Sequence, residues 1–142
     1  MSMSMSMMKM VMLEEYSCSL DFETAVERVR QQALDAGWRI PVEFPLQEHY
    51  IEAGLKDMSK THNLYLCNPE GGYTISRDDD FKPMFVLMPT PLSIYEDSKG
   101  RVKITRFRLG RMASMFGGEV KQTLLDGEAR LQKALEGVIE EG

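Results

Sequence analysis

Cys67 is the side chain in this sequence best suited to chemistry, because a thiol can act as a nucleophile or carry a sulfur atom. The four residues 64–67 (LYLC) are all apolar or aromatic, which is typical of a buried strand covered on both faces. Asn68-Pro69 follows directly. Since proline lacks an N–H group and restricts the residue before it, we expect the strand to end at Cys67, with the sulfur near the edge of the sheet.

One hypothesis is therefore a thiol-based redox or sulfur-carrier protein. A helix that starts within Pro69-Glu70-Gly71-Gly72 would place its N-terminus beside the Cys67 sulfur, an environment that favours the thiolate. The other cysteine, Cys18, lies far away in the sequence and alternates with serines in a half-buried strand, so we interpret it as a core residue. Without a CxxC pair to resolve a disulfide, a sulfur carrier fits better than an oxidoreductase.

Methionine, aromatic and arginine residues indicate a second possibility, a pocket for a small or anionic ligand. Met84 and Met88 precede the proline-rich residues 89–91, and Met112, Met115 and Phe116 lie in 109–118 (LGRMASMFGG). The basic stretch 99–111 lies between these segments, and such a mixture is typical of ligand pockets. The candidate ligand-binding residues, with the thiol turn included, are Cys67, Asn68, Met84, Met88, Arg106, Arg108, Met112 and Phe116.

A metal or haem site is the third possibility, using His49, His62, Cys67 and Met84, but their spacing matches no recognised ligand set. We therefore assign no metal site, and the sequence names no cofactor. The hydrolase motif GxSxG and the phosphate loop GxxxxGKS do not occur in the sequence either. These observations favour a non-catalytic protein, with Cys67 as the one candidate reactive group.

Composition and charge argue against nucleic acids and membranes as partners. The chain has 142 residues, 43% hydrophobic and 27% charged, with a net charge of −5. Nucleic-acid binding requires clustered lysine and arginine, so we expect no nucleic-acid partner. No apolar run approaches the ~20 residues of a membrane helix, and no secretory signal is recognisable. Because two cysteines cannot form a disulfide framework, we expect free thiols and a cytoplasmic location, without a membrane partner.

The elements that would position these residues form an α+β pattern. We expect the order strand, helix, strand, short helix, strand, short helix, hairpin and long helix. Asp21 is placed to cap a helix that ends at Gly37, and alternation over 38–44 predicts a strand that Pro41 restricts to an edge. Residues 92–95 and 102–107 predict a β-hairpin, and a long helix starts near Glu119. Gly127 predicts a bend, a break or close packing of that helix against another backbone.

The predicted fold is therefore a single α+β domain over residues 11–142. It has a curved, mainly antiparallel sheet of about five strands, an N-terminal helix and a long C-terminal helix. Residues 1–10 alternate methionine with serine and are expected to be a disordered tail.

Several of these segments together resemble the prokaryotic family catalogued as domain of unknown function 302. The resemblance is carried by SLDFETAVERVRQQALDAGW (19–38), CNP (67–69), PLSIYEDSKGRVKI (91–104) and RMASMFGG (111–118), and it covers nearly all of residues 11–140. It implies a small α+β domain, often dimeric, with no established reaction. Similar sequences often carry an asparagine where this chain has Phe107-Arg108, and fewer prolines where it has Pro89 and Pro91, so no ligand is carried over at those positions.

The sequence thus favours a homodimeric, non-catalytic module that binds a small or anionic ligand. The alternative is a redox or sulfur-carrier protein that uses Cys67.

Overall fold

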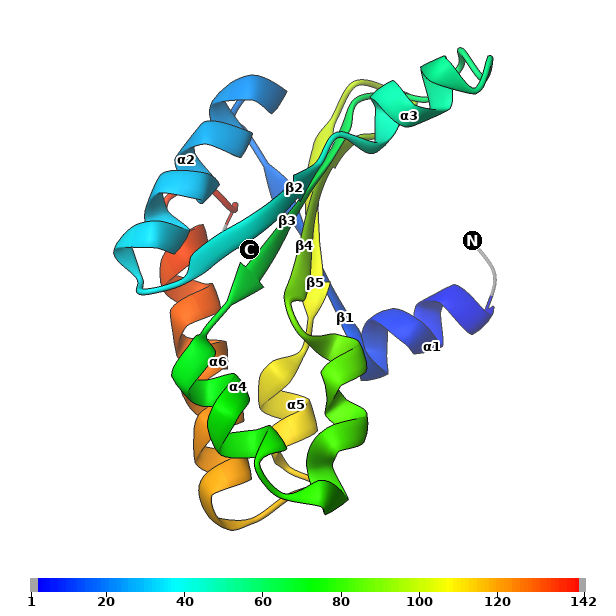
Figure 1. Cartoon of the computed structure of the whole chain (residues 1–142). Coiled ribbons are helices and arrows are strands. Elements are labelled where there is room, and N and C mark those ends of the chain that lie inside the picture. Colours follow the sequence, from blue (N-terminus) through cyan, green and yellow to red (C-terminus); the bar gives the residue numbers. More distant parts are fainter. Residues whose placement is uncertain (1–2, 141–142) are drawn as a thin grey trace.

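A five-stranded antiparallel sheet organises the molecule, with strand order β1-β5-β4-β3-β2 (Figure 1). This computed structural model describes residues 3–140. The strands are β1 (Leu13–Cys18), β2 (Arg39–Phe44), β3 (Thr61–Cys67), β4 (Thr90–Glu96) and β5 (Val102–Phe107). The helices are α1 (Met3–Val11), α2 (Phe22–Asp35), α3 (Leu46–Glu52), α4 (Pro69–Ser76), the 3-10 helix η1 (Asp79–Leu87), α5 (Leu109–Ala113) and α6 (Gly118–Leu135). The predicted α+β class, single domain and long C-terminal helix are confirmed.

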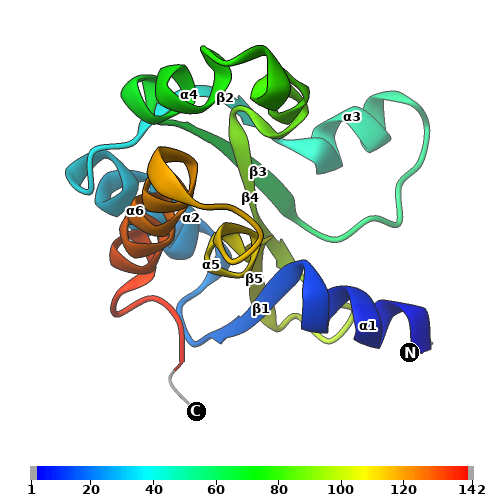
Figure 2. The same ribbon diagram turned by 90° about the horizontal axis from the view of Figure 1, so that it is seen from below.

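Helices α2 and α6 lie side by side on one face of the sheet, whereas α1 and α3 lie on its other side (Figure 2). The main core fills the space between the sheet and the α2–α6 pair. The large buried side chains of the three central strands alternate along each strand and meet buried side chains of the two helices; among them are Leu64, Leu66, Leu92, Ile94 and Ile104 from the strands and Val29, Leu131 and Leu135 from the helices. This period-two burial is what an antiparallel sheet with one covered face produces.

Strand β3 differs from its prediction in one respect. The apolar run 64–67 was interpreted as covered on both faces, but only Leu64 and Leu66 are fully buried. Tyr65 and Cys67 are half-buried on the opposite face, because α1 and α3 flank that face without covering it as α2 and α6 cover the other. The strand ends at Cys67, as the following Asn68-Pro69 predicts.

Local signals explain where helix α2 begins and where it ends. The Asp21 side chain accepts a hydrogen bond from the Thr24 backbone N–H at 2.8 Å and so caps the helix start. Gly37 ends the helical segment with φ +94°, a conformation that favours glycine. The chain then enters β2, an edge strand whose pairing with β3 is irregular between Arg39 and Val42, around Pro41.

A separate layer closes one end of the sheet, at the bottom of Figure 1. It contains α4, η1, α5 and the first half of α6, and its core is Ile75, Ala113, Val120 and Leu124, surrounded by Phe81, Met84, Met88, Met112 and Phe116. Helix α6 runs without interruption through Gly127. A Cβ at Gly127 would lie 3.1 Å from Leu109 Cδ1, so the glycine does pack closely, but against side chains and not against another backbone as predicted.

The N-terminal segment also differs from expectation. Residues 3–10 were predicted to belong to a disordered tail, but they form most of helix α1; residues 1–2 lie outside the described residues. Two arginines far along the chain bind backbone carbonyls of this helix, a contact that local periodicity does not contain. Over residues 3–140, no helix combines the length and apolarity needed to cross a membrane.

Candidate ligand pocket

A pocket of about 310 Å³ lies where the end of β3 meets α4, η1, α5 and α6. We call it the α4 pocket. Its floor is formed by the lining residues that are buried, Trp38, Leu66, Gly71, Ile75, Ser76, Leu109, Leu124 and Gly127. Its rim is formed by the half-buried and exposed lining residues, Cys67, Asn68, Pro69, Gly72, Tyr73, Met84, Phe85, Leu87, Met88, Pro89, Thr90, Met112 and Thr123.

The α4 pocket is uncharged: among residues 3–140, no aspartate, glutamate, lysine, arginine or histidine lines it. Most of the lining is aliphatic, aromatic or thioether. Apolar walls with a few polar groups are the usual make-up of small-molecule sites.

Two of the polar side chains in this wall have partners within the protein. Asn68 Oδ1 accepts a hydrogen bond from the Gly71 N–H at 3.4 Å and caps α4, and Ser76 Oγ donates to the Gly72 carbonyl at 2.6 Å. The indole N–H of Trp38 is fully buried and has no acceptor among the residues that the structure describes.

Five of the eight predicted site residues meet in this pocket: Cys67, Asn68, Met84, Met88 and Met112. Phe116 does not line it, although it packs in the same hydrophobic cluster and stacks edge-on against Phe81, with ring centroids 5.9 Å apart. The two arginines are not among the lining residues. The sequence analysis missed the floor, since Trp38, Leu109 and Gly127 come from three distant segments; the glycine inside a helical pattern was the one signal of close packing.

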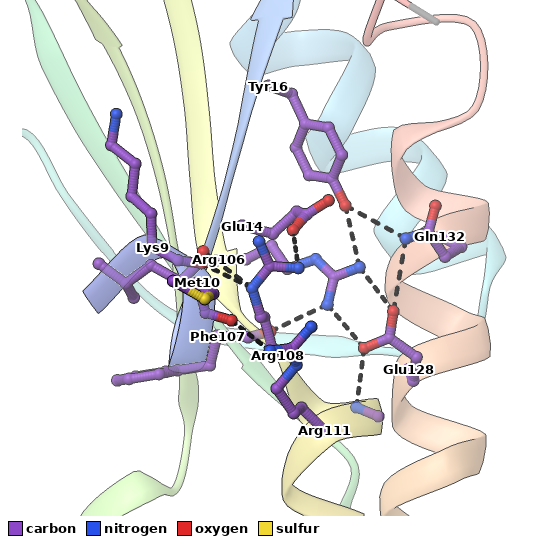
Figure 3. A network of polar contacts seen from close by, with 12 residues as sticks. Lys9, Met10, Glu14, Tyr16, Arg106, Phe107, Arg108, Arg111, Glu128 and Gln132 are labelled. Carbon is purple, nitrogen blue, oxygen red and sulfur yellow. Dashed lines mark hydrogen bonds and ion pairs between the residues drawn. The ribbon is translucent and has the colours of Figure 1, made fainter. Parts of the chain in front are cut away.

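Arg106 lies on the covered face of the sheet, 3% exposed, in a network with α6 (Figure 3). Its Nη1 and Nη2 donate to Glu128 Oε1 and Oε2, both at 2.6 Å, and Nη2 also donates to the Tyr16 hydroxyl at 2.9 Å. Glu128 further accepts from the Gly110 N–H at 3.0 Å. Burial raises the pKa of Glu128, but the hydrogen bonds from Arg106 and Gly110 outweigh burial and hold that pKa below its ordinary value.

Arg108 is also occupied by the protein itself. Its Nε donates to the Lys9 carbonyl at 2.8 Å and to the Leu13 carbonyl at 3.1 Å, and its guanidinium pairs with Glu14 (Figure 3). The positive charges that suggested an anionic ligand are therefore paired with carboxylates of this chain, away from the α4 pocket.

The two cysteines have different surroundings. Cys18 is 8% exposed, and burial raises the pKa of its thiol, in agreement with a core role. Cys67 is half-buried on the pocket rim, directly before the Asn68 cap of α4.

His62 Nε2 lies 2.8 Å from Glu43 Oε1, and the described residues contain no group of three or more His, Cys, Asp or Glu side chains that could hold a metal ion.

Comparisons with known proteins agree with this fold. The family model described as "Domain of unknown function DUF302" matches residues 14–139. A crystal structure of an uncharacterized conserved protein DUF302 from Bacillus stearothermophilus superposes with a TM-score of 0.73 at 21% sequence identity, covering 87% of this chain and 95% of that one. A search of curated proteins found no match.

Proposed function

The chain belongs to the DUF302 family, and we propose that it is a non-catalytic module that binds one small, neutral, largely apolar molecule in the α4 pocket. The observation that carries the proposal is a pocket of about 310 Å³ whose described lining contains no charged side chain. Burying an apolar ligand there is favourable by about 25 cal/mol per Å² of apolar surface removed from water.

A neutral ligand is a narrower choice than the small or anionic ligand expected from the sequence. An anion would have to leave water for an uncharged cavity, which costs several kcal/mol without a compensating cation. Arg106 and Arg108 cannot supply that cation while they are paired with Glu128 and Glu14.

A matched pair of fluorescent probes tests the proposal. N-phenyl-1-naphthylamine is neutral, and 8-anilino-1-naphthalenesulfonate adds a sulfonate to the same skeleton. We expect the neutral probe to bind one site per chain, with at least about tenfold higher affinity than the sulfonate, because about 1.4 kcal/mol separates each tenfold step. Equal affinities, or several weak sites, would contradict the proposal.

A pocket-filling variant locates the site. Gly72 lines the pocket, and a Cβ placed there would lie 3.6 Å from the Sδ atom of Met88, which also lines the pocket. Gly72→Leu should therefore abolish binding of the neutral probe. Thr74→Leu adds a leucine to the same helix at a position outside the pocket lining and should leave binding unchanged. Thermal unfolding of both variants controls for loss of fold.

A homodimer is the second part of the proposal. It is supported by exposed apolar side chains on one helix, because large exposed apolar patches often mark protein interfaces. These are Met5, Met7, Met8, Met10 and Val11 of α1. Sedimentation velocity over a range of concentrations should detect a two-chain species, and a single one-chain species at all concentrations would contradict the homodimer.

We keep the cytoplasm as the proposed location and propose no nucleic-acid partner, given the net charge of −5.

A sulfur carrier remains the second candidate function, favoured by the position of Cys67 on the pocket rim at the start of α4. In that case the pocket would shield a sulfur atom carried on the thiol. Cys67 should then react with iodoacetamide faster than a cysteine in an unstructured peptide at the same pH. An equal or slower rate would remove this candidate.

A further inference from the structure

The 3-10 helix η1 (Asp79–Leu87) forms one wall of the α4 pocket. It is the green coil that follows α4 at the bottom of Figure 1. Met84, Phe85 and Leu87 of this helix line the pocket, and so does Met88 directly after it. None of the nine residues of η1 is buried. A segment that buries no residue can move away from a pocket without opening the core.

The backbone of η1 also gives it less support than an α-helix would have. Because 3-10 hydrogen bonds have poorer geometry, such helices rarely exceed about three or four residues. This one extends over nine residues, and Pro83 inside it has no N–H group to donate. The segment is therefore held less firmly by its own hydrogen bonds than the neighbouring α4.

The polar side chains of η1 and of its cap interact only within the segment itself. Lys82 pairs with Asp79, and Asp78 Oδ1 accepts a hydrogen bond from the Asp80 N–H at 2.9 Å. Among residues 3–140, no side chain of η1 forms a hydrogen bond or an ion pair with another helix or strand. Apolar packing is what remains to hold η1 against the domain.

That packing is concentrated in the first part of η1. The Phe81 ring lies edge-on against Phe116 of the segment before α6, with ring centroids 5.9 Å apart, and Met84 packs against the same cluster. Near the other end, Phe85 is 53% exposed and Val86 is 86% exposed. A single aromatic contact, which does not line the pocket, thus contributes much of the attachment of this wall.

We propose that η1 is a lid of the α4 pocket, which moves away from α4 to admit the ligand and returns to cover it. This inference rests on the proposed function and deepens it, because it says how the ligand enters and leaves. Ligands in such pockets are buried over most of their surface, so a wall has to move before they pass the rim. Of the segments that line the pocket, η1 has the weakest ties to the domain.

Hydrogen exchange tests whether η1 opens. The matched control is α3, which also has no buried residue but lies on the other side of the sheet. In the free protein, η1 should exchange faster than α6. N-phenyl-1-naphthylamine at ten times its Kd should slow exchange in η1 about tenfold and leave α3 unchanged, because only about a tenth of the chains keep a free lid. Exchange in η1 as slow as in α6, or no slowing by the bound probe, would overturn the lid.

Stopped-flow fluorescence separates a lid from a fixed wall. Phe81→Leu keeps an apolar side chain and removes the ring contact with Phe116, without changing the pocket lining. Because the open state becomes more populated, association and dissociation of the neutral probe should both become about three- to tenfold faster, with Kd changed by less than about twofold. Val86→Ala, on the exposed part of the same helix, should leave both rates unchanged.

The failures are distinguishable. If the probe binds one site per chain but only its dissociation becomes faster in Phe81→Leu, or neither rate changes, η1 is a fixed wall. The lid is then overturned while the proposed function stands. If Phe81→Leu does not fold, the exchange data of the wild-type protein decide the question. If no neutral probe binds, both the lid and the proposed function are overturned.

Discussion

Arg106 and Glu128 form a two-pronged ion pair across the main core, with Nη1–Oε1 and Nη2–Oε2 distances of 2.6 Å each. The pair joins β5 to α6, and the Glu128 carboxylate also binds the N–H of Gly110 in α5. It therefore ties β5 to α5 and α6, two of the elements that line the α4 pocket, without contributing a side chain to the lining.

Removing one member of this pair should lower the stability of the folded protein. Glu128→Gln leaves the 3%-exposed Arg106 with an uncompensated charge, and we expect the free energy of unfolding at pH 7 to fall by about 3 kcal/mol. Urea denaturation measures it. Asp126→Asn is the matched control on the same helix, because Asp126 pairs with Arg130 at 2.8 Å in a more exposed position and should contribute under about 1 kcal/mol. Equal losses in the two variants would contradict the structural role.

The lowered pKa of Glu128 predicts that the free energy of unfolding depends on pH. Its pKa is below 4.5 in the folded protein, so between that folded pKa and 4.5 the unfolded chain binds more protons. The stabilisation is present above pH 4.5 and is lost as the pH falls through the folded pKa. Urea denaturation at pH 7, 5 and 4 should show the difference between wild type and Glu128→Gln shrinking toward acid. A constant difference would contradict this assignment.

Asn68 links local structure to the pocket, since its side chain both caps α4 and lines the rim. Asn68→Ala should lower the free energy of unfolding by about 1 kcal/mol and weaken probe binding, because the first turn of α4 loses its cap. Asn68→Asp can cap equally well and should retain stability. If both variants were equally destabilised, the amide group would matter for a reason other than capping.

The order of elements followed from local patterns. The Asp21 cap, the Gly37 stop, the Pro41 edge strand and the end of β3 at Cys67 each depend on a few neighbouring residues, and each appears in the structure. The alternation over 102–107 placed Arg106 on the same face as Val102 and Ile104, which is the buried face.

What local patterns could not provide were partners from distant segments. Nothing near Arg106 identifies Glu128 as its counter-ion, so its charge was interpreted as available to a ligand. Helix α1 has no clear apolar period, and its ties come from Arg108 and Arg111, about a hundred residues later. The pocket floor likewise unites Trp38 with residues of α5 and α6. Pairings of this kind depend on tertiary packing, which overrides local propensity.

The two thiols should differ in reactivity in the folded protein. Cys67 is half-buried on the rim, whereas Cys18 is 8% exposed with a raised pKa, so iodoacetamide should modify Cys67 alone until the protein unfolds. Peptide mass spectrometry follows each site. N-phenyl-1-naphthylamine at ten times its Kd should slow Cys67 modification by about tenfold, because only about a tenth of the pockets remain free. An unchanged rate would place the probe elsewhere.

Helix α1 should detach when its arginine contact is removed. Arg108→Gln deletes the Nε–H that donates to the carbonyls of Lys9 and Leu13, and it breaks the ion pair with Glu14. Carbonyls at a helix C-terminus need such donors, so hydrogen exchange in residues 3–12 should become about tenfold faster while exchange in α6 is unchanged.

The matched control for this detachment is Arg101→Gln, which removes an exposed arginine paired with Asp97 in the β4–β5 hairpin. It should leave exchange in α1 unaltered, because its partner belongs to the hairpin turn. Faster exchange over the whole chain in Arg108→Gln would mean that this arginine supports the domain as a unit. Unchanged exchange in residues 3–12 would mean that α1 is held by its contacts with β1 alone.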